Sequence, residues 1–97
     1  AGLYEQAAVQ LERALRIQPR NPVVLQRMAE VQLRAGDYEQ ALAFAERSYD
    51  VGPRVGELCS RNWRTISVSR ERLGDRNGSR DAEKRAGTCM ITKPEGY

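Results

Sequence analysis

The stretch Ala35-Gly36-Asp37-Tyr38-Glu39-Gln40-Ala41 has a near copy at the start of the chain, Ala1-Gly2-Leu3-Tyr4-Glu5-Gln6-Ala7. The two glycines are 34 residues apart (36 − 2), and the same spacing relates Pro19-Arg20 to Pro53-Arg54. A period of about 34 residues is typical of helix–turn–helix repeats, which bury their apolar faces against their neighbours. The pattern therefore predicts a short stack of helical repeats.

The Gly-Asp pairs predict tight turns between antiparallel helices. Glycine adopts the left-handed conformation that ends a helix, and the aspartate that follows it can cap the next one. Asn21-Pro22 is a second start signal, with a capping side chain followed by proline at the first helical position. These signals and the apolar periodicity predict helices over residues 3–18, 22–35, 38–51, 57–73 and 77–86. Within the last of them, Asn77-Gly78-Ser79 favours a turn, and only Ala82 and Ala86 offer apolar side chains.

The period lengthens in the second half of the chain. Gly74-Asp75 follows Gly36-Asp37 by 38 residues (74 − 36), four more than the repeat length. Because a helical turn has about 3.6 residues, we expect one inserted turn near residues 54–59. The same register places Trp63 where Leu25 stands in the preceding unit, which predicts a core residue. Residues 88–97 show no packing pattern, and we expect a disordered tail there.

Composition excludes several kinds of chemistry. The 97 residues carry a formal charge of +3 and include no histidine, which removes His-based catalysis and His-ligated metal sites. Two cysteines, Cys59 and Cys89, cannot by themselves supply a four-ligand zinc site, and they do not look like a disulfide framework. We therefore expect both to be free, partly buried thiols. No apolar run is long enough to span a membrane, and no signal peptide is visible. We predict no catalytic residue, metal or cofactor in this chain, and the residues leave its localisation open.

Arginine greatly outnumbers lysine, which occurs only at Lys84 and Lys93. Codon bias in a GC-rich genome explains such a preference. So does selection for guanidinium contacts to carboxylate or phosphate groups, and both readings stay open.

The motifs resemble the tetratricopeptide repeat (TPR), whose pattern is Trp-x2-Leu-Gly-x2-Tyr, Ala-x3-Phe, Ala and Pro. Trp63-x2-Ile66-Ser67 is similar to the first part, Ala7-x3-Leu11 and Ala41-x3-Ala45 to the second, and Pro19 and Pro53 to the closing proline. The resemblance implies an all-α, right-handed superhelical stack of antiparallel helix pairs, with about two and a half repeats. Residues 1–87 would form the repeat domain, as a half repeat (1–21), a repeat (22–53) and a repeat with the inserted turn (54–87), followed by the tail (88–97).

The resemblance also implies a function, because the first helix of each TPR pair lines a concave groove that holds a peptide or a helix of a partner. Carried over by position, the groove would be lined by Gln26, Arg27, Glu30, Arg34, Arg61, Arg64, Thr65, Val68 and Arg72. A groove so rich in arginine favours an acidic protein or peptide partner. Two alternatives remain: a helical arm of a larger enzyme or regulator, and a nucleic-acid-binding repeat. The charge excess is too mild to favour nucleic acid, and we expect neither nucleic-acid binding nor membrane insertion.

The N-terminal helix predicts a further interaction. In the family's geometry its Ala7, Leu11 and Ala14 would pack on a preceding helix, and in this chain they would face water. We therefore expect a weak homodimer through this helix, because burial of apolar surface is favourable and a two-fold contact needs one self-complementary patch.

Overall fold

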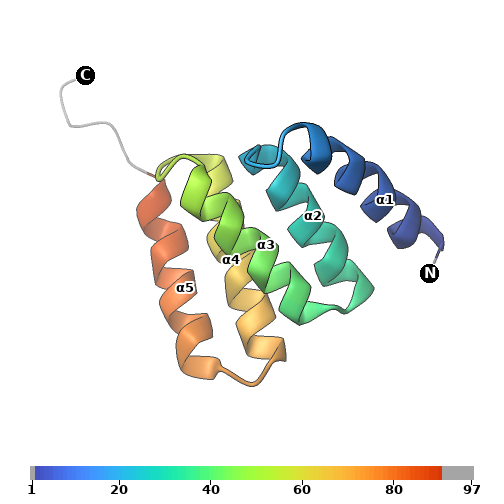
Figure 1. The fold of residues 1–97 in the computed structure, drawn as a ribbon. Coiled ribbons are helices and arrows are strands. Elements are labelled where there is room, and N and C mark those ends of the chain that lie inside the picture. The colour runs from blue at the N-terminus through green and yellow to red at the C-terminus, as the bar shows by residue number, and fades with distance from the viewer. Residues whose placement is uncertain (1, 91–97) are drawn as a thin grey trace.

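Five α-helices form the part of the chain that the computed structural model describes, residues 2–90, and no strand occurs there (Figure 1). The helices are α1 (Gly2–Ile17), α2 (Pro22–Ala35), α3 (Tyr38–Val51), α4 (Glu57–Arg72) and α5 (Arg76–Cys89). Each of them packs on the next one along the chain, and α2 also contacts α4. The predicted all-α stack of helix pairs is confirmed.

The helix ends follow from local side chains, as the sequence predicts. The Asn21 side chain accepts hydrogen bonds from the backbone N–H groups of Val23 (3.0 Å) and Val24 (3.2 Å), which begins α2. Gly36 ends α2 with φ of 87°, a conformation that favours glycine. Asp37 then accepts from the backbone N–H of Gln40 at 3.2 Å and begins α3. Two helices are thereby joined by two residues, which forces them to lie antiparallel.

The predicted insertion lies at the start of α4. In the 38-residue register Pro22 corresponds to Ser60, whereas α4 begins at Glu57. The three extra residues form about one helical turn. The register also places Trp63 correctly: its side chain is 8% exposed and packs edge-to-face on Tyr49, with ring centroids 4.8 Å apart. Trp63 is therefore a core residue that joins α3 to α4.

The fifth helix is longer than predicted, since it extends from Arg76 to Cys89 and not from residue 77 to 86. Thr88 and Cys89 are thus helical, although we expected the tail to begin at residue 88. Asp75 caps α5 by accepting from the backbone N–H of Gly78 at 2.8 Å. A Cβ at position 78 would collide with that carboxylate, so glycine is needed there for Asp75 to cap the helix. Gly78 therefore lies within α5, although the sequence Asn77-Gly78-Ser79 favours a turn. Met90 follows directly after α5, and residues 91–97 of the expected tail lie outside the described residues.

The expectation of free thiols is wrong, because Cys59 and Cys89 form a disulfide with their Cα atoms 5.7 Å apart. The extra turn of α4 carries Cys59, and the extension of α5 brings Cys89 beside it. The backbone N–H of Gly56 also donates to the carbonyl of Cys89 at 2.7 Å. The C-terminal end of α5 is therefore held to the start of α4 by one covalent bond and one hydrogen bond.

The core lies between α2, α3, α4 and α5, and it consists of small side chains around a few large ones. Ala29, Ala45, Ile66 and Ala82 are completely buried and allow the helices to approach closely. By contrast, no residue of α1 is buried. The first helix is accordingly the most exposed element of the stack. Within the described residues, no helix has the length and apolar character needed to cross a membrane.

Candidate protein-interaction surface

The first helices of the two complete pairs, α2 and α4, lie next to each other and form the face on which the groove was predicted. A glutamine and an ion pair hold the two helices together. Gln26 Nε2 donates to Thr65 Oγ1 at 3.3 Å and to Glu30 Oε2 at 3.1 Å. Arg61 Nη2 lies 2.9 Å and 3.0 Å from the two carboxylate oxygens of Glu30. The structure thus brings these four predicted residues into one network.

Burial separates the predicted groove residues into two groups. Gln26 is 1% exposed and Thr65 is 5% exposed, so both lie beneath the surface and hold α2 against α4. The other members are accessible to different degrees: Glu30 is half-buried, while Arg27, Arg34, Arg61, Arg64, Val68 and Arg72 are exposed. A partner on this face would therefore meet an arginine-rich surface, with Gln26 and Thr65 acting as support.

Three of the exposed arginines have no acidic partner in the described part of the chain. Arg27, Arg34 and Arg64 form no ion pair there, whereas the carboxylate of Glu30 is already engaged by Arg61. Arg72 Nη1 donates to the hydroxyl of Tyr38 at 3.1 Å, and its guanidinium carbon lies 5.6 Å from the centroid of that ring. Three guanidinium groups remain available for carboxylates of another molecule.

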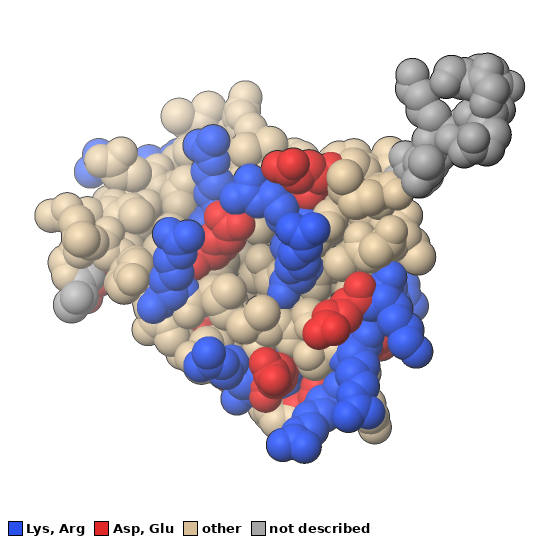
Figure 2. Space-filling view, turned by 180° about the vertical axis from the view of Figure 1, so that it is seen from behind, with Lys and Arg blue, Asp and Glu red and all other residues tan. Residues whose placement is uncertain are grey.

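The charge on the back of the molecule is mixed. In the view from behind, where α4 is no longer covered by α3, basic side chains surround smaller groups of acidic ones (Figure 2). Acidic and basic side chains are thus interleaved on this face of the molecule.

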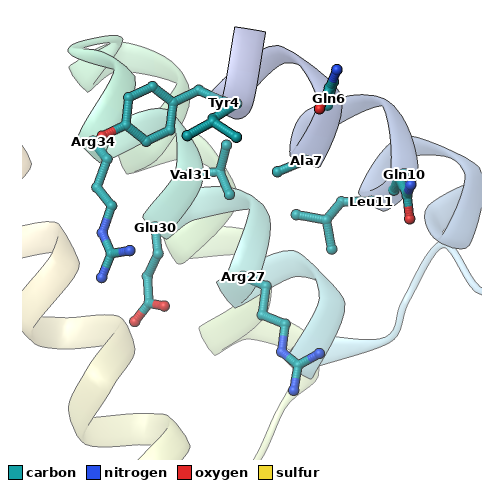
Figure 3. A pocket seen from close by; sticks show the side chains of 10 residues that line it. Tyr4, Gln6, Ala7, Gln10, Leu11, Arg27, Glu30, Val31 and Arg34 are labelled. Atoms are coloured by element: carbon teal, nitrogen blue, oxygen red, sulfur yellow. The ribbon is translucent and has the colours of Figure 1, made fainter. Parts of the chain in front are cut away.

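A second groove lies between α1 and α2, and it shares Arg27, Glu30 and Arg34 with the predicted site residues. It has a volume of about 650 Å³ and is lined by Leu3, Tyr4, Gln6, Ala7, Gln10, Leu11, Arg27, Glu30, Val31 and Arg34. Ala7 and Leu11 of α1 point toward Val31 of α2, and Tyr4 lies beside Arg34 (Figure 3). The repeat register could have found this groove, because its α1 residues occupy the positions that α3 uses to pack on α2 and α4.

Within residues 2–90, no group of three or more His, Cys, Asp or Glu side chains comes together. The buried polar side chains there act in packing. Ser48 Oγ donates to the carbonyl of Pro22 at 2.7 Å and accepts from Asn62 Nδ2 at 2.8 Å, which links α2, α3 and α4.

Comparisons with known proteins agree with this architecture. A family model described as "Tetratricopeptide repeat" matches residues 1–48. The chain belongs to the tetratricopeptide repeat family. Its structure is similar to that of the globular C-terminal domain of Pseudomonas aeruginosa LpoP, with 40% sequence identity and a TM-score of 0.83; the match covers 89% of this chain and 81% of the other. No curated protein matches the sequence. Domains of this kind typically mediate protein–protein interaction, and the LpoP-like domain is a helical module of the same type.

Proposed function

We propose that this domain is a protein-interaction scaffold whose α2–α4 face binds an acidic segment of a partner protein. The observation that carries the proposal is the set of three exposed arginines without ion pairs among the described residues, Arg27, Arg34 and Arg64. Guanidinium groups bind carboxylates through charge-assisted, often bidentate hydrogen bonds. An extended or helical segment with two or three acidic side chains fits this surface.

The supporting network gives the surface a fixed shape. Because Arg61 is held by Glu30 and Arg72 is held by Tyr38, their positions are set before a partner arrives. Exposed ion pairs contribute only about 0–1 kcal/mol to stability, so a role in positioning is a better account of the Arg61–Glu30 contact than a role in folding. A preorganised face loses less entropy on binding. The scaffold needs no catalytic residue and no cofactor for this function.

Reversal of the charge of one arginine on the α2–α4 face should weaken the binding of an acidic peptide. For Arg64→Glu we expect the affinity for a fluorescein-labelled peptide rich in Glu and Asp to fall about tenfold, which corresponds to about 1.4 kcal/mol. Fluorescence anisotropy at low salt measures this change, and added salt should weaken the wild-type complex because it screens exposed charges. A lysine-rich peptide of the same length should bind more weakly than the acidic one.

Arg16→Glu is the matched control. It changes the net charge equally, at an exposed position of α1 that belongs neither to the α2–α4 face nor to the α1–α2 groove. It should leave the affinity within about twofold of wild type, a difference of less than 0.5 kcal/mol. Equal binding of acidic and basic peptides at low salt would reject the proposal. So would an equal loss of affinity in both variants, because it would reveal a response to net charge and not to this face.

A further inference from the structure

We propose that Glu30 determines which acidic segments the α2–α4 face accepts, because it selects a segment whose acidic side chains flank one uncharged position. The inference rests on the proposed function and adds to it the sequence pattern of the partner. It is carried by the place of Glu30 among the arginines, by the fixed position of its carboxylate and by the unused donors of Arg61.

Glu30 is the one acidic residue in a surface of arginines. It is the only acid among the predicted groove residues, and α2 contains no other. Arg27 lies three residues before it and Arg34 four residues after it, which places all three on the same face of the helix. Figure 3 shows the side chains of Glu30 and Arg34 next to each other on α2. A negative charge therefore lies in the middle of the surface that is proposed to receive carboxylates.

The carboxylate of Glu30 is fixed in place from two helices. Gln26 Nε2 donates to it at 3.1 Å, and Arg61 Nη2 lies within 3.0 Å of both of its oxygens. Gln26 is 1% exposed and also donates to Thr65 at 3.3 Å, so its amide has little freedom to turn. Departure of Glu30 would leave one N–H of this buried amide without its acceptor, which is unfavourable. We therefore expect Glu30 to keep its position when a partner binds.

A partner on this face would meet the fixed charge directly, since the Glu30 side chain remains 29% exposed. A partner carboxylate over Glu30 would be repelled by it. A lysine in the same place would meet Arg34 and Arg61 beside it. The carboxylate accepts three hydrogen bonds within the domain, which leaves capacity for about one more. An uncharged side chain that donates a hydrogen bond, such as that of glutamine, fits this position best.

The arginines on both sides of Glu30 set the spacing of the acidic side chains. At 1.5 Å per helical residue, Arg27 lies about 4.5 Å before Glu30 along the axis of α2, and Arg34 lies about 6 Å after it. An extended segment advances about 3.3 Å per residue. Acidic residues one or two positions away from the uncharged one therefore come level with Arg27 and Arg34.

Arg61 can contribute to the same contact from the facing helix. It reaches Glu30 through Nη2 alone, and none of the described residues accepts from its Nη1 or Nε. A guanidinium has five N–H donors in a planar fork, so its other edge can bind a partner carboxylate while Glu30 holds its orientation. The structure thus fits a segment in which acidic residues precede and follow one glutamine-like residue.

Two labelled peptides of identical composition test the proposal. Between Gly-Ser spacers, one carries the interrupted core Glu-Glu-Gln-Glu-Glu and the other the contiguous core Glu-Glu-Glu-Glu-Gln. In the contiguous core, either a glutamate faces Glu30 or one side lacks acidic residues, whichever register it adopts. Fluorescence anisotropy at low salt should therefore show that wild type binds the interrupted core about fivefold more tightly.

Glu30→Gln should remove this preference. The two peptides should then bind within about twofold of each other, and the affinity for the contiguous core should rise about fivefold. Glutamine keeps an oxygen that can accept from Gln26 and Arg61, and circular dichroism should report an unchanged fold. A purely structural role of Glu30 would not produce a dependence on the order of residues in the peptide.

Glu39→Gln is the matched control, because it removes the same charge at an exposed position of α3 that is not among the predicted groove residues. This variant should keep the fivefold preference of wild type. Loss of the preference in Glu39→Gln as well would overturn the proposal, since it would reveal a response to net charge.

The remaining outcomes separate this inference from the proposed function. Equal binding of the two peptides by wild type would overturn the inference, and the proposed function would stand if Arg64→Glu weakened both. A preference that persists in Glu30→Gln would overturn it too, because another residue would then read the order. If wild type bound neither peptide, the proposed function would fail, and this inference with it.

Discussion

Loss of the Cys59–Cys89 bond should lower the free energy of unfolding by roughly 3–4 kcal/mol. A cross-link restricts the unfolded chain, and the loss of entropy grows with the length of the loop that it closes. Here the two cysteines are 30 residues apart, which places the estimate in that range. For a domain of this size, such a change should reduce Tm by more than about 10 °C.

The last helix packs on α4 mainly through small side chains. The buried side chains of α5 are Ser79, Ala82, Ala86 and Cys89, and none of them is large. The polar contacts to α4 are short but few: Ser67 Oγ donates to the carbonyl of Ser79 at 3.0 Å, and Arg70 Nη1 donates to that of Gly78 at 3.2 Å. Without the disulfide we expect the C-terminal end of α5 to separate first and to expose Trp63.

Thermal unfolding followed by circular dichroism measures the effect in a Cys59→Ala, Cys89→Ala double variant. Alanine is the suitable replacement because it adds no polar atom to a site where Cys59 is 1% exposed. A reductant should lower the Tm of wild type toward that of the variant and leave the variant unchanged. A wild-type Tm that is insensitive to a reductant strong enough to release both thiols would show that the bond is not required for stability.

Truncation of Trp63 to alanine should destabilise the domain by about 3–5 kcal/mol. Trp63 packs on Tyr49 and belongs to the main apolar cluster, and the Arg85 guanidinium carbon lies 5.1 Å from its ring centroid. Small domains have a total stability of about 5–15 kcal/mol, so the variant should be close to unfolding at room temperature. Chemical denaturation followed by circular dichroism gives the difference directly.

Leu73→Ala is a suitable control for that comparison, because Leu73 is 43% exposed and its truncation should cost less than about 1 kcal/mol. The chain has a single tryptophan, so its fluorescence reports on this site alone. Emission from native protein should be blue-shifted and should move to longer wavelength on unfolding. Native emission typical of a water-exposed indole, or a Trp63→Ala variant as stable as the control, would contradict the assigned core position.

Much of the fold could be predicted from the sequence because its helix ends depend on neighbouring residues. Asn21, Gly36 and Asp37 act within one or two turns of their own positions, so the predicted bounds of α2 and α3 match the structure. The fifth helix was harder to predict, since α5 lacks an apolar stripe and depends on α4 for burial. The disulfide was missed for the same reason: its geometry depends on three helical residues beyond Ala86.

The site was less predictable than the fold. Positions carried over from the family name residues of α2 and α4, but they could not distinguish side chains on the surface from those beneath it. Gln26 and Thr65 are buried because α2 and α4 approach closely at that point, and this contact depends on packing across 39 residues of sequence. The repeat register marks Ala7 and Leu11 of the α1–α2 groove, but the way in which α2 closes its other wall depends on tertiary structure.

We propose above that an acidic segment of a partner binds to the α2–α4 face. Amide chemical shifts of the isotope-labelled chain, recorded during a titration with the acidic peptide, test it most directly. We expect the largest shifts at exposed positions of α2 and α4, including Arg27, Arg34 and Arg64, and only small ones on α5. Shifts confined to α3 and α5, or no shifts at peptide concentrations that saturate the anisotropy signal, would show that the acidic segment does not bind to the α2–α4 face.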